Sequence, residues 1–285
     1  MTYQDAKLWF EKELSAIYNS SETDFLFSVV IQKITGWDRF NYRKEMAKEM
    51  GVEHYEDLKK NIIQLKLGKP YQQILGETEF YGLTFFVDEH VLIPRPETEE
   101  LLELAIEKIQ EAGGKMQDLS IKILDIGTGS GIIPIVLKKH FPNAQLSAID
   151  FSEKALMIAQ RNADFHQVEI NFVHQDYLKE NVSEIFDVII SNPPYIGREE
   201  EKDIADSVKE FEPKMALFSP TSNALIFYEK IAKDCKNHLA QSGLVFLEIN
   251  QKLGEETLEL FTDVLSDAVL LKDLSGNDRF VWGSK

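Results

Sequence analysis

Residues 121–134 read IKILDIGTGSGIIP, and this stretch decides the class of fold. An apolar run suited to a buried strand is followed by a glycine loop and then by the apolar start of a helix. A strand that turns through glycines into a helix is typical of the first unit of a doubly wound α/β sheet. Because ligands bind such sheets at the carboxyl ends of the strands, the loop predicts a ligand site at that edge.

The residues that follow extend the same pattern to the end of the chain. Apolar segments alternate with helical ones, which indicates a mostly parallel sheet covered on both faces. The predicted strands are 121–126, 145–150, 169–174, 186–191, 243–249, 268–274 and 278–283. The last two are close in sequence, so we expect them to add antiparallel strands at one edge. The sequence thus predicts an α/β, Rossmann-like fold with a seven-stranded, mostly parallel sheet.

The residues before this region indicate two further parts. Residues 1–70 have helical periodicity without strand alternation, which predicts a small helical bundle. Ser21 to Asp24 is a candidate helix N-cap, and Gly36, Gly51 and Gly68 are candidate C-caps. We interpret the bundle as a substrate-docking module, although it could merely decorate the main domain. Residues 71–93 are expected to form a β-hairpin linker, and residues 94–285 the main domain.

Composition and charge narrow the classes of function. The chain has 285 residues and a formal net charge of -17, and its one cysteine excludes an internal disulfide. Residues 1–75 carry 11 basic and 11 acidic side chains, so the whole negative charge lies beyond them. Such an acidic body should repel a phosphate backbone. We therefore expect a cytoplasmic, metal-free protein that is monomeric and binds neither nucleic acid nor membrane.

The glycine loop consists of Gly127, Thr128, Gly129, Ser130 and Gly131, and its surroundings predict the bound ligand. The spacing G-x-G-x-G differs from that of dinucleotide sites and P-loops, and Asp125 would favour a cation over a phosphate. Asp150 ends the next strand and could accept the hydroxyls of a ribose. Asp176 and Tyr177 follow the third strand, where they could contact an adenine. These features together indicate S-adenosylmethionine.

The segment SNPPYI, residues 191–196, ends the fourth predicted strand and indicates the acceptor of the reaction. A planar amino group has two N–H donors, which the Asn192 side-chain oxygen and the Pro193 carbonyl could accept. Pro193 and Pro194 would hold that carbonyl in a fixed direction, and Tyr195 would cover the planar group. Two such acceptors favour the positive charge that develops on the nitrogen as it is methylated. A simple proline-rich stop signal would leave Asn192 and Tyr195 unexplained.

Several segments together resemble the HemK/PrmC family, the release factor glutamine methyltransferases. They are PYQQILGETEFYGLTFFVDEHVLIPRPETEELLE, LDIGTGSGIIPIVL, SNPPYI, EFEPKMALF and KDLSGNDRFVWG. The resemblance implies a helical N-terminal domain, a hairpin linker and a class I methyltransferase domain. It implies methyl transfer from S-adenosylmethionine to N5 of the glutamine in the Gly-Gly-Gln motif of class I peptide-chain release factors, which modulates translation termination.

The resemblance also assigns residues. It matches the glycine loop, Asp150 and Tyr177 to the cofactor site, and residues 192–195 to the clamp for the substrate amide. It places Arg95 and Glu97 near the cofactor pocket. One departure is Asn250, which stands where the family usually has glycine.

Other functions remain open from the residues alone. A sister enzyme that methylates a glutamine of a ribosomal protein carries the same N-P-P-Y motif and a helical N-terminus. A DNA amino-methyltransferase would need a basic face, which the acidic composition disfavours. A binding module that has lost catalysis would not need an intact Asn192.

Overall fold

The computed structural model describes residues 1–113, 120–197, 200, 202 and 206–285. The chain divides into two compact units, Met1–Glu77 and Thr78–Lys285. The segment 71–93, for which the sequence predicts a linker, is divided between these two units.

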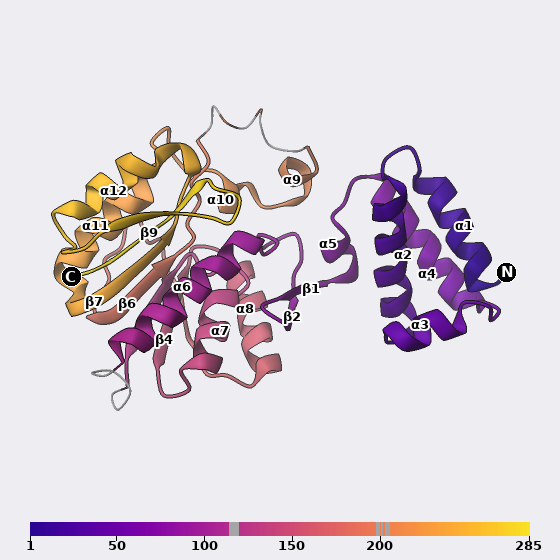
Figure 1. Ribbon diagram of the computed structural model, residues 1–285, viewed down its shortest axis with the longest axis horizontal. Helices are drawn as coiled ribbons and strands as arrows, with labels where there is room; N and C mark the ends of the chain where they lie inside the picture. The colour runs from indigo at the N-terminus through magenta and orange to yellow at the C-terminus, as the bar shows by residue number, and fades with distance from the viewer. Residues whose placement is uncertain (114–119, 198–199, 201, 203–205) are drawn as a thin grey trace. The chain divides into compact units, whose positions relative to one another are not determined.

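The smaller unit is a helical bundle with its own core (Figure 1). Phe10, Phe27, Ile31 and Leu58 are fully buried between the helices. Burial of a large apolar side chain contributes about 1.5–3 kcal/mol, so this core stabilises helices that would be marginal alone. The helices are α1 (Tyr3–Leu14), α2 (Ser20–Thr35), α3 (Arg39–Glu45), α4 (Val52–Lys66) and α5 (Tyr71–Leu75).

The ends of these helices correct two of the predicted caps. Helix α2 begins one residue before the predicted cap, because Asn19 accepts the Glu22 backbone N–H while Glu22 accepts that of Asn19. Gly51 is the N-cap of α4, so its prediction as a C-cap was wrong. Gly36 is the C-cap of α2, as predicted, and Gly68 follows the C-cap of α4.

The predicted hairpin around Tyr81 and Gly82 is confirmed. Strands β1 (Glu77–Phe80) and β2 (Leu83–Phe86) pair in a two-stranded sheet with these two residues as the turn. Phe80 and Phe85 are buried in the core of the larger unit, and their rings meet edge to face with centroids 6.1 Å apart. Packing thus fixes the hairpin to the larger unit.

The larger unit is built on a seven-stranded sheet with the order β5-β4-β3-β6-β7-β9-β8. Its fold class, α/β and mostly parallel, is confirmed. Helices form most of the connections between the parallel strands, but residues 175–185 connect two of these strands without a helix. The strands are β3 (Lys122–Ile126), β4 (Gln145–Asp150), β5 (Asn171–His174), β6 (Phe186–Ser191), β7 (Leu239–Glu248), β8 (Val269–Lys272) and β9 (Asp278–Ser284).

The final two strands differ in detail from the prediction. Strand β9 runs antiparallel to both β7 and β8 and lies between them. Strand β8, at the edge, therefore has the same direction as the parallel strands. The hairpin-like pairing of β8 with β9 is local, whereas the insertion of β9 beside β7 depends on long-range packing.

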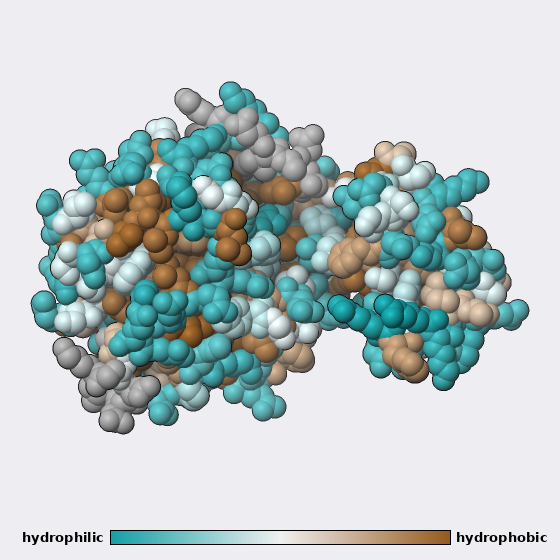
Figure 2. All heavy atoms as spheres, viewed as in Figure 1, coloured by the Kyte–Doolittle hydropathy of each residue, from teal (hydrophilic) through white to brown (hydrophobic). Residues whose placement is uncertain are grey.

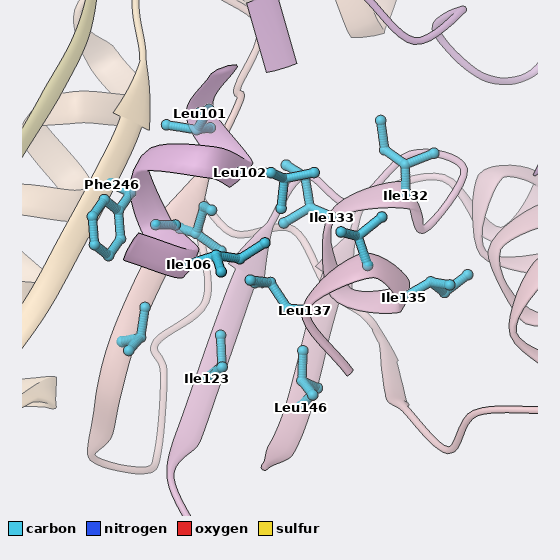
Figure 3. Packing of buried hydrophobic residues seen from close by; sticks show 14 of the residues in the cluster. Leu101, Leu102, Ile106, Ile123, Ile132, Ile133, Ile135, Leu137, Leu146 and Phe246 are labelled. Atoms are coloured by element: carbon cyan, nitrogen blue, oxygen red, sulfur yellow. The ribbon is translucent and has the colours of Figure 1, made fainter. Parts of the chain in front are cut away.

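Helices cover both faces of this sheet. Alternate residues of β3 point to opposite faces. Ile123 joins the core beneath α6 and α7 (Figure 3), while Leu124 joins the core beneath α11 and α12. One face carries α6 (Pro96–Ala112), α7 (Ile132–His140) and α8 (Glu153–His166), and the other carries α11 (Ile226–His238) and α12 (Gly254–Thr262). The short elements are α9 (Asp206–Phe211), α10 (Lys214–Leu217) and η2 (Gln251–Leu253).

The face of the molecule drawn in Figure 2 is largely hydrophilic. On the face drawn in Figure 2, teal side chains cover most of the described surface and hydrophobic ones form small groups between them. Within the described part of the chain, no helix has the length and apolar character needed to cross a membrane.

Candidate active site

Three neighbouring strands bring the predicted site residues to one edge of the sheet. Strand β3 lies between β4 and β6, and Ile126 is in register with both Ile149 and Ser191. The glycine loop, Asp150 and Asn192 therefore leave the sheet side by side at its carboxyl edge. The sequence placed each of them after its own strand, and the register brings them together.

The glycine loop is tied to β4 by its backbone. The Gly127 and Thr128 N–H groups donate to the Ile149 carbonyl, and the Gly129 N–H donates to Asp150 Oδ2 at 2.8 Å. Gly129 has a φ of 55°, and a Cβ there would meet nothing within 4 Å, so the loop offers open space to a ligand. A Cβ at Gly131 would instead lie 3.0 Å from that of Ala159 on α8. Gly131 thus lets α7 and α8 pack closely.

Asp125 beside this loop is a buried acid without a partner. Both of its carboxylate oxygens, and the Thr128 hydroxyl, are buried and make no hydrogen bond within the described residues. Burial raises the pKa of Asp125 to about 7, and the negative charge of Asp150 adds to this. The Thr128 hydroxyl opposes the rise because it lies near the carboxyl, although it does not reach hydrogen-bond geometry. A buried, unpaired carboxylate suits a cationic ligand. The sulfonium and ammonium groups of S-adenosylmethionine fit this chemistry.

Asp150 is oriented by two backbone donors. Its Oδ1 accepts the Ser152 N–H at 2.8 Å, and its Oδ2 accepts that of Gly129. Burial raises the pKa of Asp150, and the two backbone N–H groups oppose this by favouring the ionised form. Each oxygen keeps a second lone pair, so the carboxylate can still accept the two hydroxyls of a ribose.

Asp176 and Tyr177 follow β5 but differ in their surroundings. Asp176 is partly exposed and forms an ion pair with Lys179 at 2.8 Å. Tyr177 is only 4% exposed, and its hydroxyl donates to Asp234 at 2.8 Å. Its ring belongs to the core beneath α11 and α12, so this tyrosine is held rigidly at the edge of the sheet.

The N-P-P-Y corner begins where β6 ends. The Ser191 hydroxyl donates to the Ile126 carbonyl at 2.7 Å, which joins the corner to the start of the glycine loop. Asn192, Pro193 and Tyr195 line a pocket of about 330 Å³ together with apolar side chains and Arg95. The Pro193 side chain is buried, Pro194 is half-buried, and the Asn192 amide nitrogen donates to Thr98 Oγ1 at 3.0 Å.

Arg95 and Glu97 lie near this pocket. Arg95 pairs with the buried Glu212 at 2.6 Å, and Glu212 also accepts the Ile93 backbone N–H. This pair joins the segment before α6 to the end of α9. Glu97 is in the first turn of α6, where its charge acts on Glu248.

Four residues of this region were missed as site residues from the sequence. Thr98 and Glu248 are buried behind the corner, Glu212 holds Arg95, and Asn250 donates to the Tyr195 carbonyl at 3.1 Å. Glu248 carried a signal, because an acid that ends an apolar strand beside β6 has no solvent to face. Asn250 was noted only as a departure from glycine, and its amide in fact supports the corner.

Comparisons with known proteins agree with this geometry. The family model described as Methyltransferase small domain matches residues 103–211. A release factor glutamine methyltransferase of Flavobacterium psychrophilum is 40% identical over 99% of this chain and 98% of its own length. One of Enterococcus faecalis is 39% identical over 86% of each chain. The solved hMettl16 catalytic domain, in complex with the MAT2A 3'UTR hairpin 6, has a TM-score of 0.53 and 18% identity over 72% of this chain and 76% of its own, which shows the fold alone.

The sheet order, the glycine loop and the acids that end its strands define a class I methyltransferase with S-adenosylmethionine as its cofactor. Identity of this extent over nearly the whole length then identifies the family. The chain belongs to the release factor glutamine methyltransferases.

The unpaired carboxylate of Asp125 predicts a pH-dependent affinity for the cofactor. Below pH 7 the free protein holds Asp125 protonated, and a cation must displace that proton. We therefore expect the dissociation constant of S-adenosylmethionine to rise about fivefold from pH 7 to pH 6. Isothermal titration calorimetry across this range measures the slope. Asp125→Asn should bind more weakly at pH 7 with a flatter profile, and an unchanged slope in that variant would contradict the assignment.

Proposed function

We propose that this chain transfers the methyl group of S-adenosylmethionine to N5 of the glutamine in the Gly-Gly-Gln motif of class I release factors, and so modulates translation termination. The observation that carries the proposal is the fixed orientation of Asn192. Its amide nitrogen donates to Thr98, so its Oδ1 faces away from Thr98 and can accept a hydrogen bond. The printed names of the curated relatives supply the identity of the acceptor.

The cofactor is held at the carboxyl edge of the sheet. Asp125 faces its cationic end, the loop from Gly127 to Gly131 lets it approach the backbone, and Asp150 accepts its ribose hydroxyls. Asp176 and Tyr177 border its adenine. When bound, S-adenosylmethionine supplies a methyl carbon made electrophilic by the attached sulfonium.

The N-P-P-Y corner holds the acceptor amide. Asn192 Oδ1 and the Pro193 carbonyl accept its two N–H groups, and the ring of Tyr195 covers its plane. Pro193 and Pro194 restrict the backbone, and Asn250 ties the Tyr195 carbonyl in place. An amide nitrogen is a weak nucleophile because its lone pair is delocalised. Two strong acceptors stabilise the positive charge that grows on it, which favours the transition state over the ground state.

The smaller unit supports docking of a protein substrate. Its residues 1–75 are electrically neutral, and Leu8, Phe25, Ile63 and Leu67 expose at least half of their side chains to solvent. Apolar side chains at such exposure suit contact with a protein surface more than with a phosphate backbone. We place the enzyme in the cytoplasm as a monomer that binds the release factor itself and no nucleic acid directly.

A methyl-transfer assay with two acceptors tests the proposal. Purified enzyme and labelled S-adenosylmethionine are incubated with a class I release factor, with its Gln→Ala variant in the Gly-Gly-Gln motif, or with large-subunit ribosomal proteins. We expect label only on the unaltered release factor, at N5 of that glutamine by mass spectrometry. Label on a ribosomal protein instead would assign the chain to the sister activity, and label on DNA would overturn the choice of a protein acceptor.

A further inference from the structure

A chain of hydrogen bonds lies behind the N-P-P-Y corner. The Asn192 Nδ2 donates to Thr98 Oγ1 at 3.0 Å, and the Thr98 hydroxyl donates to Glu248 Oε2 at 2.7 Å. The other oxygen of Glu248 accepts the Tyr195 hydroxyl at 3.1 Å. Thr98 comes from the first turn of α6 and Glu248 from the end of β7. Three separate elements therefore meet behind the corner.

The number of protons available in this series of hydrogen bonds fixes the direction of each bond. A threonine hydroxyl has one proton, and an ionised carboxylate can only accept. The Thr98 proton therefore goes to Glu248, and the Thr98 oxygen is left to accept from Asn192. The nitrogen of the Asn192 amide must face Thr98, so its oxygen faces the opposite way. A flipped amide would present N–H groups to the N–H groups of the substrate.

Glu248 is a buried acid with its own supports. It is 1% exposed, and its backbone carbonyl accepts the Tyr228 hydroxyl at 3.1 Å. Burial raises the pKa of Glu248 to about 7, whereas the bonds from Thr98 and Tyr195 and the charge of Arg279 oppose this. A buried carboxyl that contributes only to packing could be replaced by an apolar residue, so its presence beside the reactive corner points to a role there.

We propose that Glu248 is the positioning residue of the acceptor site, setting the Asn192 amide through Thr98 and holding Tyr195 directly. The inference rests on the proposed function, because it concerns the residues that hold the acceptor amide. Glu248 touches neither acceptor nor cofactor in this role. It determines which way the clamp faces.

Two substitutions of Thr98 separate positioning from packing. Thr98→Val keeps the shape and removes the hydroxyl, whereas Thr98→Ser keeps the hydroxyl and removes a buried methyl group. We expect Val to lower kcat about 10- to 100-fold and Ser to stay within about threefold of wild type. The dissociation constant of S-adenosylmethionine should change less than about threefold in both, because neither variant alters the cofactor site. A packing role predicts the reverse order, since Ser loses more buried apolar surface.

A pH profile tests Glu248 itself. Four groups face its carboxyl: Arg279 from β9, Glu97 from α6, Tyr195 from the corner and Tyr228 from α11. Protonation turns one of the accepting oxygens into a donor, so kcat at saturating cofactor should fall as the pH drops below about 7. For Glu248→Gln we expect kcat to fall by about tenfold at most. The kcat of this variant should not fall further as the pH drops below about 7.

The wild-type arm of the assay separates the two proposals. Absence of methyl transfer from wild-type enzyme to the release factor overturns the proposed function. Transfer by wild type with equal kcat for Thr98→Val, or equal losses for Val and Ser, overturns only the positioning role of Glu248. Melting temperatures of each variant show that the enzyme assayed is folded.

Discussion

Replacing Asn192 with alanine is expected to lower kcat at least about a thousandfold and to leave the dissociation constant of S-adenosylmethionine within about threefold. The substitution removes the side-chain oxygen proposed to accept from the substrate amide, and it leaves the glycine loop, Asp125 and Asp150 unchanged. Loss of an acceptor that acts mainly in the transition state lowers kcat and kcat/KM together. Single-turnover methylation of a release factor and calorimetric titration of the cofactor measure the two quantities.

Asn250→Ala is the matched control for this prediction. Asn250 is a buried asparagine, whereas Asn192 is half-buried, and the Asn250 amide donates to the Tyr195 carbonyl and to Glu200. We expect its loss to lower kcat only about tenfold, because the Asn192 and Pro193 acceptors remain. Turnover close to wild type in Asn192→Ala would end the amide-clamp mechanism, whatever the control shows.

The second large effect is expected for Asp150→Ala, which should raise the dissociation constant of S-adenosylmethionine about a hundredfold. Two hydrogen bonds from a ribose to an ionised acceptor contribute about 1.5–3 kcal/mol each in a buried setting, and part of that is retained by water. The substitution also frees the Gly129 N–H, which Asp150 accepts at 2.8 Å, so the glycine loop loses its tie to the end of β4. Calorimetry and the concentration dependence of the melting temperature both report the change.

Asp176→Ala provides the comparison at the end of the neighbouring strand. Asp176 is partly exposed and paired with Lys179, so solvent compensates for its loss. We expect the affinity to fall less than about tenfold in this variant. A larger loss there than in Asp150→Ala would show that the main cofactor contact has been assigned to the wrong acid.

Much of the fold could be predicted from local pattern. The strand–loop–helix at residues 121–134, the alternation after it and the hairpin turn at Tyr81 and Gly82 each depend on neighbours in sequence. The α2 cap was misplaced because Asn19, Ser20 and Ser21 are all good caps, and only the reciprocal bond between Asn19 and Glu22 decides among them. The insertion of β9 depends on pairing with β7, far away in sequence.

The residues of the site also divide into those that local sequence predicts and those that depend on long-range packing. Residues that follow strand ends, such as Asp150 and Asn192, could be predicted because parallel strands bring their carboxyl ends to one edge. The hydrogen bonds that join Thr98 and Glu248 to this site could not, since Asn192 and Thr98 are 94 positions apart and Thr98 and Glu248 are 150 apart. Their partnership depends on how α6 packs over the sheet. The motif therefore predicts the groups that contact the substrate, whereas tertiary packing determines the groups that orient them.

The unpaired carboxylate of Asp125 has a consequence for protein engineering. Because burial raises its pKa to about 7 from the ordinary 3.8 of an aspartate, folding stability is lost as the pH rises between these values and the acid ionises in the unfolded chain. A neutral substitute at this position should raise the melting temperature at neutral pH while weakening the binding of the cofactor. Selection for thermal tolerance alone would therefore favour its loss, and only selection that also demands methylation would retain the acid.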